Sequence, residues 1–120
     1  MKWRDVSILF IILLGFFSFV GCEKAGPPML KEIGPVKTKA GVVFNAQPDN
    51  EAAIWVITEN ATRSTVVIWD EKQIPSYFQN SKYITASVPK ELYSKPGQYK
   101  VYLLDTKTGA KSNSLTFTVE

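Results

Sequence analysis

The chain has 120 residues, with 14 Lys and Arg, 11 Asp and Glu and no His, so it contains one domain at most. Its net charge of +3 is mild and excludes a dedicated electrostatic nucleic-acid binder, whose basic residues would be clustered. With no His and a single Cys, Cys/His zinc sites and nucleophiles activated by His are excluded. The hydrophobic content of 45% argues against disorder.

The N-terminal part has the features of a secretion signal. A short charged start, Met1–Asp5, precedes an apolar run of sixteen residues from Val6 to Gly21. A bilayer span takes about twenty residues, so the run is short for a permanent membrane helix and fits the hydrophobic region of a signal peptide. Lys2 and Arg4 favour a cytoplasmic location for the start. We therefore expect residues 1–21 to be a signal peptide.

The apolar run ends in Phe19-Val20-Gly21-Cys22, which resembles the lipobox of bacterial lipoproteins, where small residues precede an invariant cysteine. Phe19 departs from the pattern, because Leu is usual there. The resemblance implies that Cys22 becomes the first mature residue and carries lipid on its sulfur and its amine. Each buried methylene contributes about 0.8 kcal/mol, so two or more chains anchor stably. An uncleaved signal anchor is the alternative.

The lipoprotein resemblance also implies a location in the bacterial cell envelope. In enterobacteria an Asp after the cysteine signals retention in the inner membrane, so Glu23 favours the outer membrane. Residues 22–35 contain five Gly and Pro residues that prevent a long helix. We expect a tether over 22–35 and a domain over 36–120, with Ile33-Gly34-Pro35 alternatively the start of the first strand. Because Cys22 is the only cysteine, this domain has no disulfide and relies on its own core.

From residue 36 onward the pattern is that of short β-strands. The expected strands are 42–44, 52–58, 65–69, 83–88, 98–104 and 114–119. In the second of these, Ile54 and Val56 alternate with Trp55 and Ile57. No long stretch has helical periodicity, although 89–93 is compatible with one helical turn. Strands at this spacing predict an all-β, antiparallel β-sandwich of about seven strands.

Four separated blocks resemble the IPT/TIG family of immunoglobulin-like domains. They are Thr65–Asp70, Ile84–Pro89, Pro96–Val101 and Ser112–Val119. The resemblance covers roughly residues 33 to 120 and implies an early-set immunoglobulin sandwich with Trp69 in the core. Glu71 stands near where the family often has Gly, and Glu59-Asn60-Ala61 replaces its usual Gly-x-Asn-Phe. Such domains usually mediate contacts or act as spacers, and the fold alone does not give the function.

No set of residues indicates catalysis, so we expect no enzyme and no cofactor. Asp70 and Glu71 are adjacent, and in a strand they would point to opposite faces rather than form a carboxylate pair. A loop of this fold could bind calcium through oxygen ligands. Its ligands would be Asp49, Asn50, Glu51 and Asp105. The chain has no Asp-rich ligand run, so we predict no metal site.

Two groups of apolar side chains are expected on the outside of the sandwich. The first is Trp55, Ile57 and Tyr83, and the second is Ile68, Tyr102 and Leu104. Exposed apolar groups often mark contact surfaces, and aromatic residues are enriched at protein interfaces. In the alternative, the tether or a loop over 71–82 covers one of these patches. A register slip of one residue would move Trp55 into the core.

These features predict a membrane-anchored envelope lipoprotein that makes non-covalent contact with an envelope or surface protein, in an accessory, scaffold or adhesion role. Planar aromatics also stack on sugar rings. A carbohydrate-binding module for surface or cell-wall polysaccharide, with Trp55 and Tyr83 as its platform, is therefore an alternative. A passive spacer is a third. Lysines spread over the C-terminal half protect sheet edges and leave open a weak preference for anionic polymers or lipid headgroups.

Overall fold

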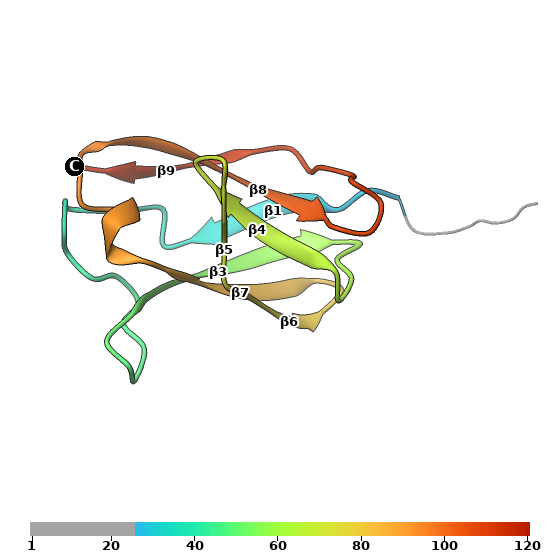
Figure 1. Ribbon diagram of the computed structural model, residues 1–120, viewed down its shortest axis with the longest axis horizontal. Coiled ribbons are helices and arrows are strands. Elements are labelled where there is room, and N and C mark those ends of the chain that lie inside the picture. Colours follow the sequence, from blue (N-terminus) through green and yellow to red (C-terminus); the bar gives the residue numbers. More distant parts are fainter. Residues whose placement is uncertain (1–25) are drawn as a thin grey trace, which may run out of the picture.

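A computed structural model describes residues 26–120, and these residues form two β-sheets that pack face to face (Figure 1). The expected signal peptide, the lipobox and the lipidation site at Cys22 lie outside the described residues. Within 26–120, no helix has the length and hydropathy needed to cross a bilayer. The all-β sandwich predicted from the strand spacing is confirmed, and its two packed sheets are consistent with the immunoglobulin-like class that the family resemblance implies.

One sheet has four strands, which are antiparallel throughout. Its order is β1 (Met29–Gly34), β3 (Ala52–Glu59), β7 (Tyr83–Val88) and β6 (Ser76–Asn80). The alternation predicted for β3 holds, because Ile54 and Val56 are buried while Trp55 and Ile57 point outward and are half-buried. The register slip that would have moved Trp55 into the core does not occur.

The second sheet has five strands and one parallel pair. Its order is β2 (Lys37–Thr38), β9 (Leu115–Val119), β8 (Gly97–Asp105), β4 (Thr65–Trp69) and β5 (Lys72–Ile74). Only β2 and β9 run parallel among the pairs of this sheet. The predicted helical turn is the short 3₁₀ segment η2 (Lys90–Leu92), which follows Pro89. The described residues thus form nine strands rather than about seven.

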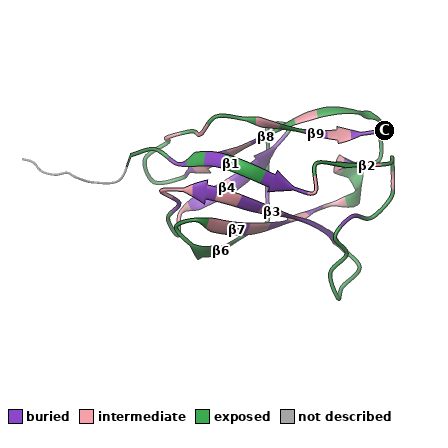
Figure 2. Ribbon diagram, turned by 180° about the vertical axis from the view of Figure 1, so that it is seen from behind, coloured by how far each residue is buried: buried purple, intermediate pink, exposed green. Residues whose placement is uncertain are grey.

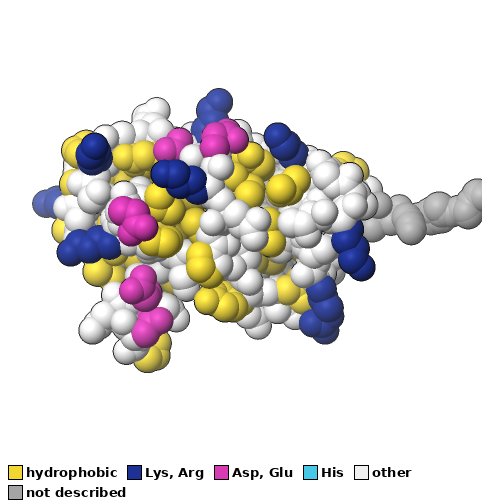
Figure 3. Space-filling model, viewed as in Figure 1, with side chains coloured by type: hydrophobic (Ala, Val, Ile, Leu, Met, Phe, Trp, Pro, Cys, Tyr) yellow, Lys and Arg dark blue, Asp and Glu magenta, His cyan; other side chains and the backbone are white. Residues whose placement is uncertain are grey.

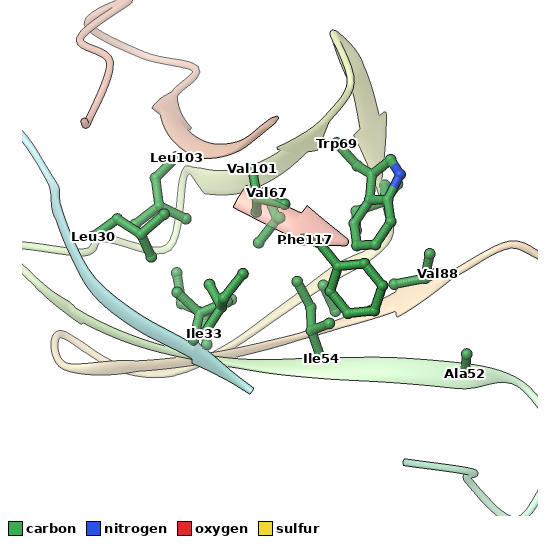
Figure 4. Close-up of a cluster of buried hydrophobic side chains, with 14 of the residues drawn as sticks. Leu30, Ile33, Ala52, Ile54, Val67, Trp69, Val88, Val101, Leu103 and Phe117 are labelled. Carbon is green, nitrogen blue, oxygen red and sulfur yellow. The ribbon is translucent and has the colours of Figure 1, made fainter. Parts of the chain in front are cut away.

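The core is built from buried residues of both sheets, and Figure 2 shows the strands that contribute them in purple. Trp69 is fully buried, and its ring centroid lies 4.7 Å from that of Phe117 and 6.4 Å from that of Phe44. Its indole Nε1 donates a hydrogen bond to the carbonyl of Leu92 at 3.3 Å. Figure 4 shows Trp69 and Phe117 side by side in this cluster. Trp69 is therefore a core residue, as expected.

The predicted tether is wrong over its last part, because Met29–Gly34 is strand β1 and pairs with β3. Leu30 and Ile33 are both only 3% exposed and belong to the core. Glycine and proline exclude a helix here but not an extended edge strand. The pairing register shifts between Leu30 and Glu32. The two buried residues are therefore three positions apart, and simple alternation does not reveal the strand.

Two other segments also differ from expectation. The apolar run 42–44 is a loop, in which Val42 and Val43 are exposed and only Phe44 is buried. The segment 71–82, expected as a loop, holds β5 and β6. Asp70 and Glu71 both have positive φ, 49° and 67°, and form the two-residue turn between β4 and β5. They are turn residues rather than strand residues, and this conformation suits a hairpin turn.

Candidate functional site

The outer face of the β1-β3-β7-β6 sheet brings together the first predicted group. Pairing places Gly34, Trp55, Thr85 and Tyr77 in one row across the four strands. The Trp55 indole lies directly over Gly34, since a Cβ at residue 34 would fall 1.9 Å from its Cζ2. This glycine lets the large ring lie flat on the sheet instead of projecting from it.

A second row lies next to the first. Ile57 and Tyr83 face each other on β3 and β7, and Glu32 on β1 pairs with Ile57. Ile57 and Tyr83 are half-buried. The predicted residues Trp55, Ile57 and Tyr83 therefore share one face. Because the strands are rigid, this face needs little ordering before it can bind a partner.

Tyr77 extends this aromatic face and was missed from the sequence, because 71–82 was expected to be a loop. It is 53% exposed and lies at the outer edge of the sheet on β6. Its neighbour Phe78 points the other way and packs against the core. Alternation of Tyr77 and Phe78 was the available signal for a strand, but the segment is short and polar on both sides.

A groove of about 280 Å³ lies on this face. Trp55, Tyr77 and Tyr83 supply its aromatic lining, and Asn45, Gln47, Thr85 and Ser87 supply polar groups. None of its lining residues is Asp, Glu, Lys or Arg. The groove can therefore offer aromatic surface together with uncharged hydrogen-bonding groups.

The loop before β3 forms one wall of the groove. Asn45 Nδ2 donates to the Ala53 carbonyl at 3.3 Å, and Gln47 Nε2 donates to the Asn45 carbonyl at 2.7 Å. These bonds use the amide nitrogens, while the side-chain oxygens of both residues accept no hydrogen bond from the described part of the chain. Buried Phe44 anchors the loop at its base. Asn45 and Gln47, which line the groove, thus keep their amide oxygens available as hydrogen-bond acceptors.

The second predicted group is less exposed than expected. Ile68 is only 5% exposed, so its assignment to an exposed apolar strip is wrong. It lies in the interior strand β4, between Tyr102 on β8 and Gln73 on β5. Long side chains on both neighbouring strands can cover a residue in that position. Leu104, the third member, is half-buried on β8.

Polar contacts also modify this second face. The Tyr102 hydroxyl donates to Glu71 Oε1 at 3.1 Å, and the Lys111 ammonium lies 5.7 Å from the Tyr102 ring centroid. Partial burial, together with the hydrogen bond and charge of Glu71, raises the pKa of Tyr102 above its usual value. Ile68, Tyr102 and Leu104 therefore make no continuous apolar surface, and the groove beside Trp55 is the stronger candidate.

Asp105 is a structural carboxylate at the end of β8. Its oxygens accept hydrogen bonds from Ser64 Oγ at 3.0 Å, from Thr62 Oγ1 at 3.3 Å, and from the backbone amides of Lys107 and Thr108 at 2.9 and 3.3 Å. Burial opposes its ionisation, but these hydrogen bonds outweigh burial and hold the pKa of Asp105 below its usual value. Among residues 26–120, no three acidic side chains gather as metal ligands would.

Replacing Asp105 with asparagine is expected to lower the free energy of unfolding by about 1–3 kcal/mol at neutral pH, because charge-assisted hydrogen bonds are lost. Because the pKa of Asp105 is lower in the folded state, its carboxylate stabilises the fold at pH values above the unfolded-state pKa of about 3.9. This stabilisation disappears as the pH falls through the folded-state pKa. The difference between the two proteins should therefore shrink in acid. Urea unfolding at neutral and acidic pH measures it.

Asp49→Asn is the matched control, because Asp49 accepts a hydrogen bond only from the Glu51 amide in an exposed turn. It should change stability much less than Asp105→Asn does. A difference between wild type and Asp105→Asn that is the same at neutral and acidic pH would contradict the role assigned to the Asp105 carboxylate.

A scan of the chain against protein-family models finds no match, and a search of curated proteins finds none either. What the protein does must therefore be inferred from its own residues and geometry.

Proposed function

We propose that this chain is a bacterial envelope lipoprotein, held by lipid on Cys22, whose IPT/TIG-like domain binds an envelope or surface protein. The groove beside Trp55 is the proposed contact surface. The Phe19–Cys22 motif supports the anchor. The four sequence blocks and the sandwich together support the family resemblance. In this proposal the outer membrane is the favoured location, and the domain has no enzymatic role.

The observation that carries the binding proposal is the aromatic groove. Trp55, Tyr77 and Tyr83 lie together on one rigid sheet face, and Tyr77 is more than half exposed. Aromatic side chains are enriched among the residues that dominate binding energy in protein interfaces. The groove lining contains no Asp, Glu, Lys or Arg, so a partner can cover the aromatics without desolvating an unpaired charge of these side chains.

A polysaccharide is the second candidate ligand, and the polar rim favours it. Asn45 and Gln47 line the groove together with Trp55 and have amide oxygens that accept no hydrogen bond from the described chain, while Thr85 and Ser87 add hydroxyl groups. Sugar hydroxyls both donate and accept hydrogen bonds, and sugar rings stack on planar aromatics. A neutral glycan therefore fits the same groove by a different chemistry.

Tyr77→Ser is the variant that tests the groove with the least effect on folding, because this side chain is mostly exposed. The lipidated protein, purified in detergent, serves as bait for detergent-solubilised envelope from the native host, and retained material is analysed for protein and sugar. We expect a retained protein whose affinity falls about tenfold or more in Tyr77→Ser, as for an aromatic hot-spot residue.

Val42→Ser is the matched control, because Val42 is 51% exposed and does not line the groove. It should retain the partner as wild type does. Sugar retained in place of protein, and lost in Tyr77→Ser, would favour the glycan. Equal retention by all three proteins would contradict binding at the groove, and no retention by any of them would leave the passive spacer.

A further inference from the structure

One end of the sandwich is formed around the point where the described chain begins (Figure 1). This entry end consists of residues 26–31, 59–64, 80–82 and 105–113. Hydrogen bonds join its segments: Asn60 Nδ2 donates to the Pro27 carbonyl at 3.2 Å, the Ala61 amide to the Ser81 carbonyl at 3.0 Å, and the Thr106 amide to the Ser64 carbonyl at 2.9 Å. The first described residues are thus tied to the loop after β3 through Asn60, and Leu30 is tied to the loop after β8 through Asn113.

The entry end has a local surplus of positive charge. It contains five basic residues and two acidic ones, whereas the rest of the described chain contains six basic and seven acidic residues. The basic residues of the entry end are Lys31, Arg63, Lys82, Lys107 and Lys111. On the face shown in Figure 3, dark blue side chains lie near the point where the grey trace meets the domain, and no magenta side chain lies there.

The two acidic residues of this end are already engaged. The Glu59 carboxylate pairs with the Lys31 ammonium at 2.9 Å, and that hydrogen bond and charge lower the pKa of Glu59. Asp105 is 8% exposed, and its oxygens accept hydrogen bonds from the neighbouring loops. The other four basic side chains make no ion pair with an acidic residue of the described chain. They are available to an external anion.

These four side chains are spread across both sheets. The Arg63 guanidinium lies 5.3 Å from the ring centroid of Phe78, on β6 of the four-stranded sheet. Lys111 lies against Tyr102, on β8 of the five-stranded sheet. Cation–π contacts of this kind hold the basic groups at the flanks of the domain. The positive surface is therefore broad, which suits an extended anionic surface better than a single small anion.

The length of chain before Gly26 indicates which anionic surface is near. Only three residues separate Cys22 from Gly26, and four fully extended residues span at most about 14 Å. Electrostatic attraction acts over about 8–10 Å at physiological ionic strength. If Cys22 carries lipid, the entry end stays close to the headgroups of the membrane that holds the lipid.

We propose that the entry end is a membrane-facing surface that binds the anionic headgroups of that bilayer and orients the sandwich on it. The inference rests on the proposed lipid anchor at Cys22. Arginine and lysine both bind phosphate, arginine through its planar fork. Each basic residue close to an anionic leaflet strengthens association roughly fivefold. Arg63, Lys82, Lys107 and Lys111 together hold the entry end down and direct the opposite end away from the membrane.

The test measures how close each end lies to the headgroups. The lipidated mature protein, residues 22–120, carries a fluorescent amino acid at Thr108, in the entry end, or at Lys95, which lies just before the opposite end of β8. Energy transfer to acceptor-labelled headgroups is measured in phosphatidylcholine vesicles with and without phosphatidylglycerol. We expect transfer from position 108 to rise with phosphatidylglycerol and to fall again at high salt, while position 95 shows no rise.

The deciding variant is the fourfold change Arg63→Gln, Lys82→Gln, Lys107→Gln and Lys111→Gln. In this variant, the ratio of headgroup-bound to unbound orientations should be at least about tenfold lower than in wild type. The matched control makes the same change at four lysines outside the entry end, Lys72, Lys90, Lys95 and Lys100, with the probe at position 108 only. Equal energy transfer from position 108 of the wild-type protein in both vesicle types would overturn the proposal. An equal loss of that transfer in the entry-end variant and in the control variant would overturn it as well.

Flotation of the protein with lipid vesicles tests the lipid anchor separately from the membrane-facing surface. Protein that floats with pure phosphatidylcholine vesicles is anchored, so the transfer measurements then decide the inference alone. Protein that fails to float there contradicts the anchor. In that case flotation with phosphatidylglycerol vesicles, and its loss in the entry-end variant but not in the control, would still support the basic surface. Absence of such flotation would reject it.

Discussion

Replacing Trp69 with alanine is expected to lower the free energy of unfolding by about 3–5 kcal/mol, the usual cost of removing a large buried aromatic. The indole is fully buried between Phe44 and Phe117, and Tyr99 stacks on it with ring centroids 6.1 Å apart. Its loss also leaves the Leu92 carbonyl without its donor. Since domains of this size are stable by only about 5–15 kcal/mol, urea unfolding of fragment 26–120, followed by circular dichroism, should show a large shift.

Trp69→Phe separates the packing of the ring from its hydrogen bond. Phenylalanine keeps the contacts with Phe44 and Phe117 but cannot donate to Leu92. We expect it to recover about half or more of the lost stability, because the hydrogen bond contributes only about 1 kcal/mol. A Trp69→Ala protein within about 1 kcal/mol of wild type would show that the core is not packed around this ring.

Gly34→Ala is expected to disrupt the candidate groove although it replaces none of the residues that line it. The added Cβ would lie 1.9 Å from Trp55 Cζ2 and 2.1 Å from Cε2, so the indole has to move. Overpacking of this kind costs about 1–3 kcal/mol. The emission of Trp55 should shift to longer wavelength as the ring becomes exposed, and the partner retained through the groove should be lost.

Two controls identify the clash as the cause. Gly26→Ala adds the same methyl group where the nearest atom, Asn60 Nδ2, is 3.9 Å away, so it should be close to neutral. Combining Gly34→Ala with Trp55→Ala removes the clash, and the double variant should be less destabilised than the sum of the two single variants. Unchanged Trp55 emission in Gly34→Ala would contradict the placement of the indole over Gly34.

The sandwich could be predicted because its central strands follow simple rules. Ile54 and Val56 alternate with Trp55 and Ile57, and the structure confirms which pair is buried. Such alternation is reliable where one face of a strand packs against a core. The same rule failed for β1, where the register shift next to Leu30 breaks the period of two. The tether boundary was therefore placed too late in the chain.

The candidate groove could be predicted only in part. Trp55 and Tyr83 lie on strands with clear alternation and were predicted correctly as outward-facing neighbours. Tyr77 was missed because the hairpin before it turns at Asp70 and Glu71, which lack the usual glycine signal. The Asn45 wall depends on the burial of Phe44, a tertiary contact that local pattern does not encode. The lipobox at Cys22 and the binding partner stay predictions.

The hydrogen bond from Asn60 to the Pro27 carbonyl fastens the first described residues to the domain. If lipid on Cys22 holds the chain, the sandwich has almost no stalk. In a chain held by lipid on Cys22, the far end of the domain can lie no farther from the lipid than the connecting chain and the domain together allow. The connecting chain spans about 14 Å, and the nine-residue strand β8 indicates a domain length of roughly 30 Å. The groove would then stay within a thin layer next to the bilayer. Partners held in the same membrane would meet it at high effective concentration, and partners fixed farther from that membrane would be out of reach.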